Sequence, residues 1–151
     1  MSEADRIAAE KTYREIGRFI FEFSQLEYTL RDYVGQEIGL NDMHFSAVIE
    51  SYDVAVLCTV AERVFEKSLS KGRFDKMRKL INKFRNLITE RNRVAHGLWV
   101  PFKDGGTVHH VSRNKLEPDI LPDRADALRK MADEACNIRA EIERGFGDIE
   151  L

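Results

Sequence analysis

Three residues within six positions carry side chains suited to chemistry: Arg91, Asn92 and His96. An imidazole titrates near neutral pH, so it can take up or release a proton during a reaction. A guanidinium presents a planar set of N–H donors that matches a phosphate group. These residue types indicate a phosphate-binding arginine beside a titratable histidine.

The segment that positions them is predicted to be an amphipathic helix from about Phe74 to Ala95, because its apolar residues recur at steps of three and four. Gly97 is expected to end this helix in the left-handed conformation. Arg91 and His96 would then lie in or near the last turn, where the helix dipole favours cations.

The spacing of the three residues matters. On a regular helix, Asn92 and His96 lie about 40° apart, whereas Arg91 and His96 lie about 140° apart. An arginine and a histidine that grip one phosphate must point together. Two solutions are open: the helix loosens before His96, or a second copy of the motif from another subunit completes the site.

The charge of the chain is uneven. Between Arg63 and Arg93 there are eleven basic and three acidic residues, a net charge of +8, although the whole chain carries −2. This basic segment is either a local phosphate-binding surface or an ordinary solvated helix face.

The pattern Arg91-Asn92-x-x-x-His96 resembles the R-x4-6-H motif of HEPN domains, in its R-[polar]-x3-H form. HEPN domains are α-helical, and many are metal-independent endoribonucleases in toxin–antitoxin, abortive-infection and CRISPR systems. The resemblance implies a helical bundle that forms a homodimer and pairs two motifs in a cleft. It also implies RNA cleavage by Arg91 and His96, with Asn92 orienting them and with no cofactor or metal. An antitoxin or a nucleotidyltransferase is an implied partner.

Residues 98–112 change to a strand-like period and predict a β-hairpin, with Pro101 restricting it to an edge. The hairpin is either an RNA-contacting arm beside His96 or a connector whose Trp99 fills the end of the bundle. The residues expected to bind RNA are Lys83, Arg85, Arg93, Trp99 and His110.

The whole pattern predicts an all-α fold, a single domain over residues 1–151 with four main helices and the hairpin inserted after the third. The expected helices are 4–38, 44–69, 74–95 and 123–145, and a loose tail follows over 146–151. Gly39 is expected to end the first helix. Ser46 is expected to cap the second helix, and Asp53 to cap a new helix if the second is broken near residues 51–53.

The second helix is expected to present Val48, Val56 and Phe65 on its apolar face. Cys58 and Cys136 are interpreted as buried free thiols, too few for a usual zinc site. The first residues lack a basic, apolar leader and no segment resembles a membrane span, so we expect a cytoplasmic protein without membrane contact.

Two other functions stay open. One is a non-catalytic HEPN module that binds RNA or nucleotide, or that partners a nucleotidyltransferase. Some members carry a tyrosine, modified by such a partner, two residues after the histidine, and Leu98 occupies that position here. The other is a purely structural helical dimer. The direction of His96 distinguishes them, because a solvent-lined position favours catalysis and a sealed core favours structure.

Overall fold

The computed structural model describes residues 2–100, 107–109 and 124–147, and these are mostly helical. The all-α class predicted from the sequence is therefore confirmed. The helices of the described residues are α1 (Glu3–Ile38), α2 (Asp42–Val48), α3 (Val54–Ser68), α4 (Lys71–His96) and α5 (Arg124–Gly147). Among these helices, none is both long enough and apolar enough to cross a membrane.

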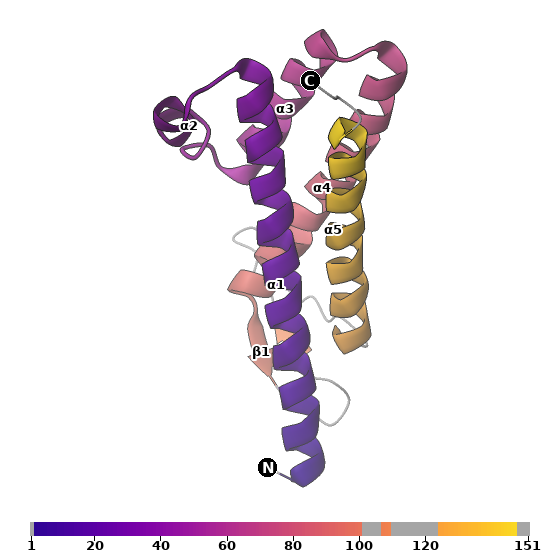
Figure 1. Ribbon diagram of the computed structural model, residues 1–151. Coiled ribbons are helices and arrows are strands. Elements are labelled where there is room, and N and C mark those ends of the chain that lie inside the picture. Colours follow the sequence, from indigo (N-terminus) through magenta and orange to yellow (C-terminus); the bar gives the residue numbers. More distant parts are fainter. Residues whose placement is uncertain (1, 101–106, 110–123, 148–151) are drawn as a thin grey trace.

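Helix α1 is the long element on which the others pack (Figure 1). It begins at a capping box, in which Ser2 and Asp5 satisfy each other's backbone N–H groups. Its core-facing side chains recur at steps of three and four, and each is at most 1% exposed: Phe19, Phe23, Leu26 and Leu30. The helix ends at Gly39, which has a φ of 75°, so the predicted bounds and the predicted stop are confirmed.

The predicted second helix is two helices, and the break falls at residues 49–53. Asp53 caps α3 as expected, since its Oδ1 accepts the N–H of Val56 at 2.9 Å. The prediction that Ser46 caps the second helix is wrong. Asn41 caps α2 instead, and Ser46 lies inside that helix.

The predicted apolar face of this segment is only partly correct. Phe65 is fully buried, but Val48 and Val56 are 39% and 43% exposed. The break restarts the helical phase at the new cap, and so a different set of positions on α3 faces the core. The buried residues of α3 are Val54, Leu57, Cys58, Ala61 and Phe65.

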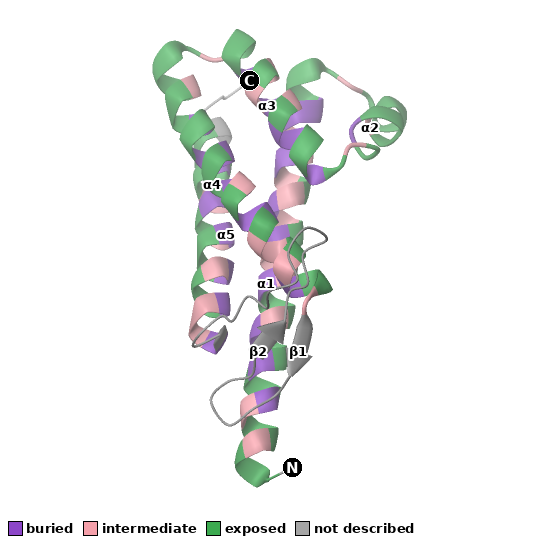
Figure 2. Ribbon diagram, turned by 180° about the vertical axis from the view of Figure 1, so that it is seen from behind, coloured by how far each residue is buried: buried purple, intermediate pink, exposed green. Residues whose placement is uncertain are grey.

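Helices α1 and α5 lie side by side and run in the same direction (Figure 1). Ion pairs join them in matching order along both helices: Glu15–Arg129 at 3.7 Å, Arg18–Asp133 at 2.5 Å and Glu22–Arg139 at 3.7 Å. Helix α4 crosses behind α1, and its C-terminal end emerges on the side of α1 away from α5 (Figures 1 and 2). This crossing decides where the candidate motif lies.

Two helix ends differ from the prediction. Helix α4 starts at Lys71 and not at the predicted Phe74, so Lys71 and Gly72 form its first turn. A glycine costs a helix only about 1 kcal/mol, which the buried apolar face of α4 offsets. Helix α5 extends to Gly147, so residues 146–147 of the predicted tail are helical. Residues 148–151 and the expected cap Asp123 lie outside the described residues.

Two short strands follow α4. β1 (Leu98–Val100) and β2 (Thr107–His109) pair antiparallel, with Trp99 opposite Val108. The hairpin expected over residues 98–112 stays a prediction, because 101–106 and 110–112 lie outside the described residues.

Candidate functional site

The backbone of α4 stays helical through His96. Gly97 follows with a φ of −78° and a ψ of 148°, and its N–H donates to the carbonyl of Arg93 at 2.9 Å. The prediction that Gly97 adopts the left-handed conformation is thus wrong, because the chain passes directly from α4 into β1 and needs an extended residue there. The helix does not loosen before His96. On this regular helix, Arg91 and His96 point about 140° apart.

Arg91 is half-buried against α1. Its guanidinium carbon lies 5.2 Å from the centroid of the Phe23 ring, and that ring lies 5.1 Å from Phe84 in the core. A cation above an aromatic face is attracted by the ring quadrupole. Arg91 Nη1 also donates to Asn92 Oδ1 at 3.1 Å. Both contacts hold the guanidinium at the boundary between core and solvent.

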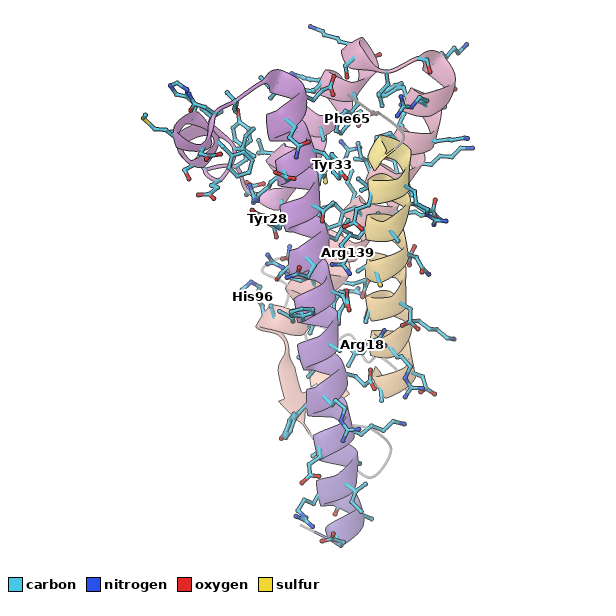
Figure 3. The ribbon with its side chains drawn as sticks, in the orientation of Figure 1. Arg18, Tyr28, Tyr33, Phe65, His96 and Arg139 are labelled. Carbon is cyan, nitrogen blue, oxygen red and sulfur yellow. The ribbon has the colours of Figure 1, made fainter. Side chains whose placement is uncertain are left out.

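His96 is the last residue of α4 and is exposed to solvent. It makes no hydrogen bond or ion pair with any described residue. In Figure 3 it lies on the side of α1 away from α5, as does Tyr28. The imidazole stands at the C-terminus of α4. It is available to a ligand, and it fills no core position.

Two of the cations expected to bind RNA have carboxylate partners. Arg85 pairs with Glu62 of α3 at 2.7 Å, and Arg93 pairs with Glu90 at 3.4 Å. A carboxylate already neutralises each of these guanidinium groups. Their contribution to phosphate binding is therefore smaller than the sequence implied.

Lys83 lies on another side of the molecule. It lines a groove of about 410 Å³ between α4 and α5, together with Lys130, Arg144 and carboxylates of α5. It also precedes His96 by about 20 Å along the helix axis. The side chain of Trp99 and all of His110 lie outside what the structure describes.

Sequence reasoning missed two exposed aromatic residues on α1, one of which, Tyr28, lies on the same side of α1 as His96. Phe21 and Tyr28 of α1 are 59% and 61% exposed. A signal was present in the sequence, because both fall outside the buried apolar seam of this helix and are seven positions apart. Exposed large aromatic side chains on a helix are candidates for contact with a ligand or a partner.

Within the described residues, no three His, Cys, Asp or Glu side chains are grouped as potential ligands of a metal ion. Arg91, Asn92 and His96 are therefore the described residues that best combine acid–base and phosphate-binding chemistry. Comparison with protein-family models, curated proteins and solved structures finds no match to this chain.

Proposed function

We propose that this protein is a metal-independent endoribonuclease of the HEPN type. One observation carries the proposal: an exposed histidine ends the helix on which, one to two turns earlier, a half-buried arginine is held by Phe23 and Asn92. A preorganised cation and a solvent-accessible acid–base group are what phosphodiester cleavage requires.

In this reaction His96 takes the proton of the ribose 2′-hydroxyl, and the resulting oxygen attacks the adjacent phosphorus. The bond between phosphorus and the 5′-oxygen then breaks, and the leaving oxygen takes up a proton. The products are a 2′,3′-cyclic phosphate and a 5′-hydroxyl. Arg91 stabilises the extra negative charge on the pentacoordinate phosphorus, while Asn92 keeps the guanidinium oriented.

We propose further that the active form is a symmetric homodimer. Because Arg91 and His96 diverge on a regular helix, the second copy supplies the groups that one copy cannot direct at the same phosphate. One imidazole then acts as the base, and the imidazolium of the other protonates the leaving oxygen. The proposal includes the HEPN arrangement of four main helices with a hairpin at 98–112, a cytoplasmic setting, and a role in toxin–antitoxin or phage defence with an antitoxin as regulator.

The same divergence favours a second candidate. Within one copy, Arg91 and His96 do not face one phosphate, as expected of a non-catalytic HEPN module that binds RNA or nucleotide, or that partners a nucleotidyltransferase. The two functions differ in whether RNA is cut or only bound.

The test incubates purified protein with a mixed RNA in the presence of a chelator. Wild type is expected to produce cyclic-phosphate ends, and His96→Ala and Arg91→Met should each lose about 10²–10⁴-fold in rate. Methionine keeps an unbranched apolar chain over Phe23, so the melting temperature should change little. His44→Ala is the matched control, since His44 is an exposed histidine on α2. Cleavage that persists in both site variants, or a wild type that cuts no RNA, would contradict the catalytic proposal.

A further inference from the structure

The surface of α1 opposite its core seam carries a stripe of exposed residues at helical spacing. Its members recur at steps of three, four, three and four positions, and each is exposed: Arg14, Gly17, Phe21, Ser24 and Tyr28. We call this set the outer stripe. Phe21 and Tyr28 are two turns apart and differ by about 20° around the helix, so both rings stand on the same face.

The outer stripe faces away from Arg91, which contacts Phe23 on the core-facing side of α1, but its member Tyr28 lies on the same side of α1 as His96. Helix α4 meets α1 at Phe23, which contacts both Phe84 and Arg91. From Arg91, the helix continues for five residues, about 7.5 Å, to His96. His96 and Tyr28 then lie on the same side of α1 (Figure 3). Helix α4 runs toward the N-terminal half of α1 (Figure 1). Phe21 lies on the N-terminal side of Tyr28 along α1.

The charges on the outer stripe suit a polyanion. Arg14 makes no ion pair with any described residue, and the stripe contains no carboxylate. The acidic residues of this part of α1 lie on other faces, where arginines pair with them: Glu15–Arg129, Glu22–Arg139 and Glu27–Arg31. A phosphate backbone that follows the stripe from Arg14 to Tyr28 therefore meets one cation and no carboxylate, and the carboxylate of Glu10, one turn before Arg14, lies 3.8 Å from Arg6.

The shape of the outer stripe suits unpaired bases. Every base has a π-face that can stack on an aromatic ring. Gly17 and Ser24 alternate with the two aromatic residues, so the stripe is a series of separated rings and not a continuous apolar patch. A protein interface of ordinary size has a contiguous apolar centre, which this surface lacks.

We propose that the outer stripe binds single-stranded RNA, with bases stacked on Phe21 and Tyr28 and a phosphate held by Arg14. This inference rests on the proposed ribonuclease function, because it places the RNA that follows the stripe beside His96. The stripe would hold RNA in unpaired form, since the bases of a duplex stack on one another and do not reach the rings.

The test measures binding of a fluorescent single-stranded RNA whose 2′-hydroxyls are all methylated, by anisotropy. This probe has no 2′-hydroxyl nucleophile, so binding is separated from cleavage. Phe21→Ala and Tyr28→Ala should each weaken binding about 5- to 150-fold, the range of stacking on one aromatic residue. Arg14→Ala should reduce the slope of log K against log salt by about 0.7. The corresponding duplex should bind less tightly than the single strand.

Tyr13→Ala is the matched control. Tyr13 is 60% exposed on the same helix but is not one of the stripe residues, and it lies about 80° around the helix from Phe21 and about 60° from Tyr28. This variant should bind the RNA like wild type. Because all four side chains are exposed, circular dichroism melting curves should superimpose.

Three results would overturn the inference: a wild type that does not bind the probe, equal binding by Phe21→Ala, Tyr28→Ala and Tyr13→Ala, or a loss of oligomer mass in the stripe variants without a change in RNA binding. The last result would make the stripe a protein interface. If binding depends on the stripe but wild type cleaves no RNA, this inference stands and the ribonuclease proposal fails. If wild type cleaves RNA but the stripe variants bind the probe like wild type, the ribonuclease proposal stands and this inference fails.

Discussion

Two phenylalanines separated by one residue on α1 provide a direct test of the fold beneath the site. Phe23 is 1% exposed and Phe21 is 59% exposed. The Phe23 ring contacts Phe84 at 5.1 Å and Phe19 at 6.2 Å, and it supports the guanidinium of Arg91. Phe23→Leu keeps an apolar side chain in the core but removes the ring from all three contacts.

The expected cost can be estimated from these contacts. An aromatic pair contributes about 0.5–1.5 kcal/mol beyond burial. A cation above a ring contributes about 0.5–1 kcal/mol, and a hydrophobic shape change in a core costs up to about 1.5 kcal/mol. Since these terms overlap, we expect Phe23→Leu to lower the free energy of unfolding by about 2 kcal/mol. For a chain of this length, the melting temperature should fall by about 4–8 °C.

Urea denaturation followed by circular dichroism measures the change as a shift of the midpoint by about 1 M. Phe21→Leu is the control, since it is the same substitution on the same helix and should stay within about 0.5 kcal/mol of wild type. If both variants lose the same stability, or if Phe21→Leu loses more, the assignment of core and outer faces to α1 is wrong.

Three further predictions concern the packing at Gly35 and the two thiols. A Cβ added at Gly35 would lie 2.5 Å from the Phe45 ring, so Gly35→Ala should loosen α2, cost about 1–3 kcal/mol and speed amide exchange in that helix. Burial raises the pKa of the Cys58 thiol to about 12, and so the folded chain keeps this proton after the unfolded chain has lost it. The free energy of unfolding should therefore fall as pH rises from about 9 toward 12, and Cys58→Ala should lack this contribution. A thiol reagent should reach half-buried Cys136 before unfolding and Cys58 only after it; rapid labelling of both in the native protein would contradict the burial of Cys58.

The long first helix was predictable because its signals are local. The core seam of α1 repeats over several turns, and Gly39 supplies the left-handed stop at its end. Asp53 was predictable as a cap for a similar reason, since an aspartate side chain reaches its own helix N-terminus. Gly97 was not. Its backbone is set by the strand that follows, and that pairing depends on residues several positions away.

The cations near the motif show a second limit of sequence reading. Charge along the chain identified α4 as basic, but the partners of its arginines come from the packing of helices. Glu62 on α3 neutralises Arg85 because α3 lies against α4. The spacing of residues within α4 does not indicate that contact. The same packing places Lys83 in the groove between α4 and α5.

The sequence by itself determined the helical class, most of the long helices and the residue types of the motif, because periodicity and side-chain chemistry are properties of short segments. Tertiary structure alone decided what those residues face. The crossing of α4 over α1 placed Arg91 on the Phe23 ring and left His96 in solvent on the side of α1 away from α5. Phe21 and Tyr28 stay exposed, and Tyr28 lies on the same side of α1 as His96. Such contacts join residues about 70 positions apart, and their geometry follows from how two helices pack together, which is absent from the pattern of either one.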